Sequence, residues 1–229
     1  LDRPLDEPPN PFEQATIDKV RVDGHILSTK PPVLPLIMTG EFWVLERLFD
    51  WQLDNAPELK RILQGMIFTL VVLPFLLALI FFVKTLALFV PEPWLRIPPL
   101  FALAFATQLP GFATQLNNHV PATGMAVVAL YFALGLSTGK LAPKPWRFAV
   151  FGLCAAFVFT LDMPMTIFPA IAGVILLTRF PLPAFLWGGL GALLPLAVHF
   201  GIMITVTGSP LPVQMNHDLY LYEGSYWRN

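Results

Sequence analysis

The chain has 229 residues, of which 55% are hydrophobic and only 13% are charged, and its formal net charge is −1. About a quarter of the residues of a soluble domain are charged, so this composition excludes a water-soluble surface and gives no reason to expect a nucleic-acid partner. The single Cys154 lies in an apolar run and is predicted to be a small buried hydrophobic side chain. Because the chain begins with Leu1 and stops inside a polar segment, we expect it to be a fragment of a longer protein.

Residues 1–62 are predicted to form an extracytoplasmic or interfacial arm. Residues 1–30 are polar and rich in proline, with one short amphipathic helix expected at 16–22. Residues 33–49 are apolar but contain Glu41, and a carboxylate in the middle of a span is costly. We therefore expect an interfacial or re-entrant helix there, with Glu41 facing either the bundle or the lipid head groups.

Six apolar runs follow, and each is bounded by proline, glycine or charge. They cover residues 64–89, 97–116, 120–138, 147–161, 164–178 and 182–206. Irregular backbone cannot face lipid, so the runs predict an all-α fold, a polytopic transmembrane helix bundle of about six spans in residues 63–206. An extracytoplasmic aromatic tail follows at 207–229. If residues 33–49 also cross the bilayer, the count becomes seven and the arm lies inside. The glycines at 188–191 are expected to allow close helix packing.

The loops between the runs differ in charge, and this difference predicts the orientation. One set of loops between the six runs holds the basic residues Arg96, Lys140, Lys144, Arg147 and Arg179. Lys84 lies close to the same side. The loops at 117–119 and 161–163 have no Lys or Arg. Positive charge marks the cytoplasmic side. We therefore expect a multi-pass protein of the inner (cytoplasmic) membrane whose polar face is extracytoplasmic.

Polar side chains from distant parts of the chain are expected to meet on that extracytoplasmic face. They are His25 and Lys30 in the arm, the Asn117-Asn118-His119 loop, Asp162, and the aromatic tail. Lys30, followed by two prolines, can bind a phosphate as a compact point charge. It can also simply anchor a helix start at the level of the lipid phosphates.

The other polar groups have two interpretations as well. Asn117, Asn118 and His119 can hydrogen-bond to sugar hydroxyls or phosphate, or they can cap a helix and turn the chain. Asp162 can pair with Lys30 or support an active site, or it can cap a helix N-terminus. The aromatic tail can cover a site or form a belt at the membrane interface.

The run Asp23-Gly24-His25-Ile26-Leu27-Ser28-Thr29-Lys30-Pro31-Pro32-Val33-Leu34-Pro35, with an apolar helix behind it, resembles a known motif. It is similar to the first-loop Lys-Pro-Pro motif of GT-C-type membrane glycosyltransferases, of the protein O-mannosyltransferase and aminoarabinose-transferase kinds. Residues 116–121 and 223–227 resemble segments of large bacterial membrane proteins of that group. At the level of topology the resemblance covers most of the chain.

The resemblance implies an enzyme that takes a sugar from a polyprenyl-phosphate carrier in the membrane and transfers it to an extracytoplasmic acceptor. Lys30, with help from His25 or His119, would contact the carrier phosphate. A second set would bind or support the substrate: Asn117, Asn118, His119 and Asp162. The family's catalytic carboxylate is expected upstream, and no base is assigned, although four carboxylates lie in the right region: Asp2, Asp6, Glu7 and Glu13. No cofactor or metal-ligand cluster is visible, although some relatives can use a divalent metal.

Two other classes of function stay open. A transporter or flippase for a lipid-linked or anionic solute would use the same polar face as its binding site. A non-catalytic membrane scaffold would need no such site. The chain has no phosphate-binding glycine loop, no Ser-His-Asp elbow and no visible inverted repeat, and the last point weakens the transporter interpretation.

Overall fold

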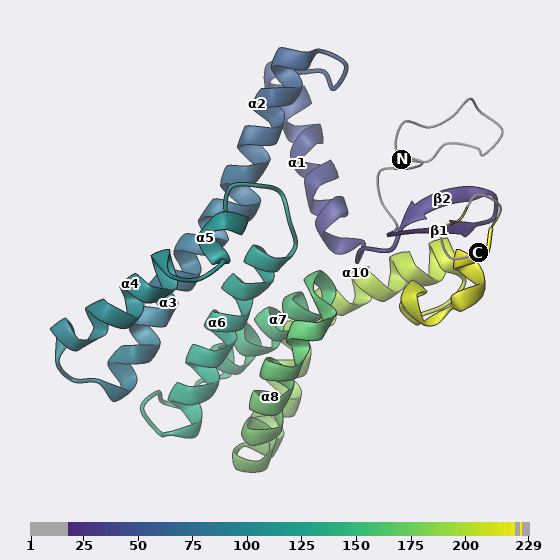
Figure 1. The fold of residues 1–229 in the computed structure, drawn as a ribbon. Helices are drawn as coiled ribbons and strands as arrows, with labels where there is room; N and C mark the ends of the chain where they lie inside the picture. Colours follow the sequence, from purple (N-terminus) through teal and green to yellow (C-terminus); the bar gives the residue numbers. More distant parts are fainter. Residues whose placement is uncertain (1–17, 223–224, 226–229) are drawn as a thin grey trace. The chain divides into compact units, whose positions relative to one another are not determined.

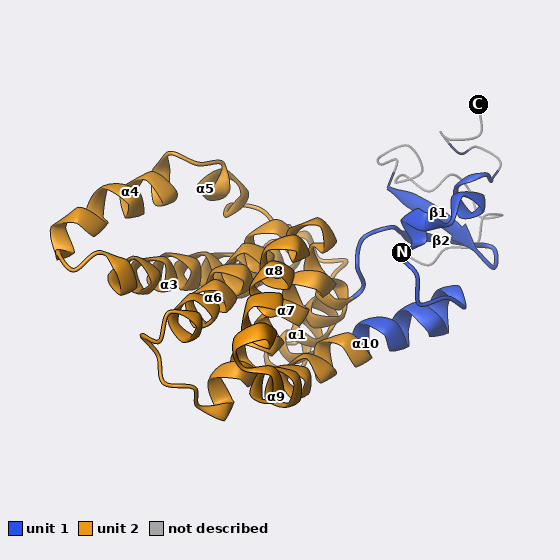
Figure 2. Cartoon of the chain, turned by 90° about the horizontal axis from the view of Figure 1, so that it is seen from below, with its two compact units in different colours: residues 1–32, 198–229 blue, residues 33–197 orange. Residues whose placement is uncertain are grey.

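The computed structural model describes residues 18–222 and residue 225, and their regular secondary structure is helical apart from one β-hairpin (Figure 1). The prediction of an all-α fold is confirmed. The chain divides into two compact units, which are residues 33–197 and a smaller unit of residues 1–32 with 198–229 (Figure 2). This division differs from the predicted one, because the beginning of the arm and the tail belong to the same unit.

The smaller unit contains a β-hairpin of β1 (Lys19–Val22) and β2 (His25–Ser28), which pair antiparallel. Asp23 and Gly24 connect the strands with φ values of 48° and 88°. Positive φ at both central residues is typical of the two-residue turn that an Asp-Gly pair favours. The amphipathic helix predicted here is wrong for residues 19–22, because Lys-Val-Arg-Val alternates with a period of two and leads directly into that turn.

A small apolar core joins the hairpin to the C-terminal part of the chain. Val20 and Val22 pack with Met203, near the end of α10 (Gly189–Thr207), and with Val213. Two short 3-10 helices follow α10: η5 (Val213–Met215) and η6 (His217–Tyr220). Full burial of an aliphatic side chain contributes about 1.5–3 kcal/mol. This core therefore fastens the two ends of the described chain together.

The larger unit begins with α1 (Val33–Phe49), which covers the run predicted to be an interfacial or re-entrant helix. A long helical stretch follows, made of α2 (Ala56–Ile67), the π-helical turn η1 (Phe68–Val72) and α3 (Leu73–Phe89). Pro74 comes just after the π-helical turn. Proline has no N–H and clashes with the carbonyl four residues earlier in a regular helix, so the wider turn accommodates it within one continuous stretch.

Glu41 of α1 faces this long stretch. The hydroxyl of Thr69 in η1 lies 2.7 and 2.8 Å from the two carboxylate oxygens of Glu41 and donates to them. Of the two orientations that the sequence left open, the structure therefore has the carboxylate directed at a neighbouring helix.

The single helix predicted over 97–116 is wrong, because two short helices replace it: α4 (Ile97–Phe105) and α5 (Leu109–Phe112). The side chain of Thr107 lies between them and accepts a hydrogen bond from the Leu109 N–H at 3.2 Å. A side chain that takes a backbone donor in this way competes with the helix. At 1.5 Å per residue α4 is about 14 Å long, which is too short to cross a hydrocarbon core of about 30 Å.

The main core lies between α3, α6 (His119–Ser137), α7 (Pro145–Leu161) and α8 (Ile167–Arg179), with α6 packed against the other three (Figure 1). Its buried members are Val128, Ala129, Phe132, Ala133, Leu136, Phe148, Phe151, Cys154, Ala172 and Leu176. The prediction that Cys154 is a small buried hydrophobic side chain is confirmed, since it is 5% exposed and has no disulfide partner.

After α8 the chain continues through α9 (Pro181–Pro183) and the π-helical turn η4 (Ala184–Gly188) into α10. Glycines allow α7 to touch this stretch backbone to backbone. A Cβ on Gly152 would lie 1.9 Å from the carbonyl oxygen of Gly188, and a Cβ on Gly191 would lie 2.0 Å from that of Ala149. The predicted close packing at 188–191 is therefore confirmed.

Three helical stretches in the described part of the chain are long and apolar enough to cross a membrane: Ala56–Phe89, His119–Ser137 and Pro181–Thr207. Pro145–Leu161 and Met163–Arg179 are shorter apolar helices. The second of these includes the short 3-10 helix η3 (Met163–Thr166) before α8.

Candidate functional site

Lys30 lies where the chain leaves the hairpin and approaches α1. Its ammonium nitrogen is 2.9 Å from Oδ2 of Asp18, and the two side chains are 55% and 49% exposed. An exposed ion pair of this kind contributes about 0–1 kcal/mol. The ammonium group is therefore open to exchange of Asp18 for a stronger anion such as a phosphate.

The backbone that carries Lys30 is fixed on both sides. The Thr29 N–H donates to the Asp18 carbonyl at 3.2 Å, and the Gln214 side chain donates to the Thr29 carbonyl at 2.6 Å. The Lys30 N–H donates to the Ser28 hydroxyl at 3.2 Å. Two prolines follow, and each fixes its own φ. The exposed Lys30 side chain therefore projects from a backbone that is held in place.

The tail contributes Tyr220 to the same part of the smaller unit. Burial raises the pKa of the Tyr220 phenol, the negative charge of Asp18 raises it further, and a hydrogen bond with Thr29 acts in the opposite direction. The phenol thus remains a hydrogen-bond donor at neutral pH. Glu223, Tyr226 and Trp227 lie outside the described residues.

His25 lies at the other end of β2 from Lys30. It pairs across the hairpin with Val22, and paired residues project from the same face of a sheet. Because Val22 belongs to the apolar core, His25 projects from the core side of the hairpin at its turn. The structure therefore places the two residues predicted to bind phosphate at opposite ends of one strand.

In the larger unit, His119 and Asp162 form a close pair. Nδ1 of His119, the first residue of α6, lies 2.6 Å from Oδ2 of Asp162, which follows α7. The Asp162 side chain is only 10% exposed, whereas that of His119 is 51% exposed. A buried carboxylate thus holds an accessible imidazole.

The two asparagines before His119 have different structural roles. The Asn117 side chain accepts a hydrogen bond from the Val120 N–H at 2.9 Å, so it closes the first turn of α6 as the capping interpretation expects. The Asn118 side chain donates to the Leu161 carbonyl at 2.8 Å. Asn118 therefore ties the loop before α6 to the end of α7, next to Asp162.

The described residues thus divide the predicted site into two groups. Lys30 pairs with Asp18 in the smaller unit, and Asp162 pairs with His119 in the larger one. The predicted alternative of a pair between Asp162 and Lys30 would join the two units, and it stays a prediction. That both groups belong to one extracytoplasmic face stays a prediction.

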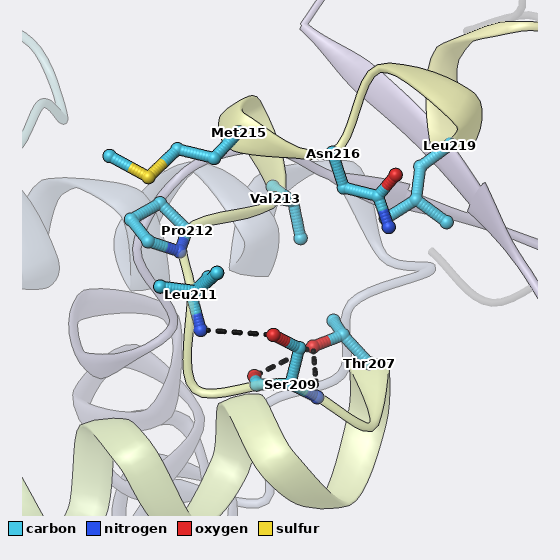
Figure 3. A pocket seen from close by; sticks show the side chains of 8 residues that line it. All are labelled: Thr207, Ser209, Leu211, Pro212, Val213, Met215, Asn216 and Leu219. Carbon is cyan, nitrogen blue, oxygen red and sulfur yellow. Dashed lines mark hydrogen bonds between the residues drawn. The ribbon is translucent and has the colours of Figure 1, made fainter.

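A pocket of about 190 Å³ lies in the tail of the smaller unit, and none of the predicted site residues lines it (Figure 3). Its lining is uncharged and mostly apolar: Thr207, Ser209, Leu211, Pro212, Val213, Met215, Asn216 and Leu219. The Thr207 hydroxyl donates to the Met203 carbonyl at 2.7 Å, and the Ser209 hydroxyl accepts from the Leu211 N–H at 3.1 Å. Both hydroxyls are therefore used within the chain, and nothing in the lining offers a charge to a phosphate.

Two further predictions concern metals and carboxylates. Within residues 18–222 and 225, no three side chains of His, Cys, Asp or Glu are grouped so that they could hold a metal ion. The carboxylates considered for catalysis lie outside the described residues: Asp2, Asp6, Glu7 and Glu13.

No protein-family model, curated protein or solved structure matches this chain.

Proposed function

We propose that this chain is part of a GT-C-type membrane glycosyltransferase, which transfers a sugar from a polyprenyl-phosphate carrier to an extracytoplasmic acceptor. The observation that carries the proposal is Lys30, whose accessible ammonium group stands on a fixed backbone. It does so within the segment whose sequence resembles the Lys-Pro-Pro motif of that family.

In this proposal Lys30 exchanges Asp18 for the carrier phosphate. When the bond between the sugar and the phosphate breaks, negative charge develops on the phosphate oxygens, and a cation placed there lowers the barrier. Tyr220 can add a hydrogen bond, because its raised pKa keeps the phenol protonated. Fixing Lys30 before the substrate arrives reduces the entropy lost when the ammonium and the phosphate meet.

We further propose that all six apolar runs lie in the inner membrane, with residues 97–112 as an interrupted segment that other helices shield from lipid. One end of the larger unit supports the proposed orientation. There, Lys140 donates to the Leu88 carbonyl and Arg179 to the Ser137 carbonyl. This end includes the C-termini of α3 and α6, whereas His119 begins α6 at its other end. Clustered positive charge favours a cytoplasmic position.

The experiment measures sugar transfer by the full-length protein in lipid vesicles that contain a polyprenyl-phosphate-linked sugar. Loss of a group that stabilises developing charge costs about 10²–10³ in rate, so we expect a reduction of that size in Lys30→Ala. Lys60→Ala is the matched control, since Lys60 is an exposed lysine of α2, and it should leave transfer within about twofold of the wild type. Equal transfer by the two variants would remove Lys30 from the mechanism.

The same vesicles separate transfer from transport. A labelled carrier lipid that crosses the bilayer without losing its sugar would favour the flippase alternative. Transfer without net crossing supports the enzyme.

A further inference from the structure

The geometry of His119 determines which ring nitrogen is available to a ligand. Oδ2 of Asp162 lies 2.6 Å from Nδ1, and an ionised carboxylate can only accept a hydrogen bond. The neutral imidazole therefore carries its proton on Nδ1, and Nε2 has a free lone pair. Since about half of the His119 side chain is exposed, that lone pair can accept a hydrogen bond from outside the chain.

The surroundings of His119 restrain both its ring and the backbone that carries it. The Phe112 ring meets the imidazole edge to face, with ring centroids 5.7 Å apart. The Thr123 hydroxyl donates to the His119 carbonyl at 2.8 Å, and Asn118 ties the same loop to Leu161. These contacts come from α5, α6 and the end of α7, so the imidazole needs little rearrangement to meet a ligand.

We propose that Nε2 of His119 accepts the proton of a ligand hydroxyl group, with Asp162 and Asn118 as positioning residues. The identity of the hydroxyl, that of the sugar acceptor, rests on the proposed function, whereas the tautomer of His119 does not. As the acceptor O–H bond breaks, its electron pair forms the bond to the anomeric carbon. The bond from that carbon to the phosphate oxygen breaks, and the phosphate keeps the pair. Asp162 balances the charge of the imidazolium, which then releases the proton to water.

The first test measures the tautomer directly. The full-length protein is labelled with ¹⁵N-histidine, placed in lipid nanodiscs in mildly alkaline buffer, and the His119 signals are identified by their loss in His119→Gln. We expect a neutral ring protonated on Nδ1. A ring protonated on Nε2, or on both nitrogens, would overturn the proposal. In Asp162→Asn, we expect protonation to shift toward Nε2, and an unchanged ring would remove Asp162 as a positioning residue.

The second test measures transfer. A general base contributes about 10²–10⁴ in rate, so His119→Gln should lose that much. Lys60→Ala, at the exposed lysine of α2 used above, is the control and should keep wild-type transfer. Equal rates in the two variants would overturn the role of His119 and leave the result for Lys30 intact. If the wild type transfers no sugar, the proposed function fails, and the NMR measurement still decides the tautomer.

Discussion

Replacing Gly152 by alanine should separate two helices that now touch. The added Cβ would lie 1.9 Å from the Gly188 carbonyl oxygen, about 1.5 Å short of the 3.4 Å at which ordinary contact begins. The obstacle is backbone, so no rotamer change relieves it. Overpacking costs about 1–3 kcal/mol, and the rigid obstacle favours the upper end. Because alanine has the higher helix propensity, it offsets at most about 1 kcal/mol of this cost. The free energy of unfolding should therefore fall by about 2 kcal/mol.

Gly189→Ala is the matched control, because a Cβ at Gly189 meets nothing within 4 Å. It should gain up to about 1 kcal/mol from helix propensity, so the two variants should differ by about 3 kcal/mol. At about 2–4 °C per kcal/mol for a chain of this size, thermal unfolding of the purified protein followed by circular dichroism should separate them by roughly 6–12 °C. Coincident unfolding curves would refute the close approach of α7 and η4.

Two further predictions concern the smaller unit and the membrane topology. In Asp18→Asn, the pKa of Tyr220 should fall, because the nearby negative charge is gone, but it should stay above the ordinary value because burial is the larger cause. A tyrosinate absorbance titration, with Tyr220→Phe subtracted, measures this shift, and an unchanged curve would exclude the contact. Cysteines placed at the exposed Gln115 and Ala142 should label from opposite sides of the membrane with an impermeant maleimide, while the buried Cys154 stays unlabelled. Labelling from the same side would contradict the proposed topology.

The sequence predicts the helices whose apolar pattern is long and uninterrupted. Residues 33–49 form α1 with the predicted bounds, and the run at 64–89 lies within one helical stretch. The prediction failed over 97–116, because hydropathy does not register the competition between the Thr107 hydroxyl and the helix backbone. It also failed at the hairpin, although the alternation at 19–22 and the Asp-Gly pair were both visible.

For the candidate site, the sequence indicated candidate residues but not how their side chains pair. It placed His119 and Asp162 in loops at the same end of their helices, which helix direction alone suggests. It could not predict the 2.6 Å contact or the Asn118 bond to Leu161, because these depend on how α6 and α7 pack. The sequence did not predict Asp18 as the partner of Lys30, because that contact requires the hairpin.

The basic side chains at one end of the larger unit also link helices to one another through hydrogen bonds. Lys140 and Arg179 each donate to a carbonyl at the end of another helix, and Arg96 donates to the Val90 carbonyl at 2.8 Å. The last carbonyls of a helix have no hydrogen-bond donor within that helix. Each of these basic side chains therefore supplies the donor that such a carbonyl lacks. Under the proposed topology, deleting such a charge would weaken the signal that orients the chain, and it would also leave a helix end without its hydrogen-bond donor. If the proposed topology holds, moving lysines and arginines one at a time to invert the chain in the bilayer would therefore also loosen the packing of these helices.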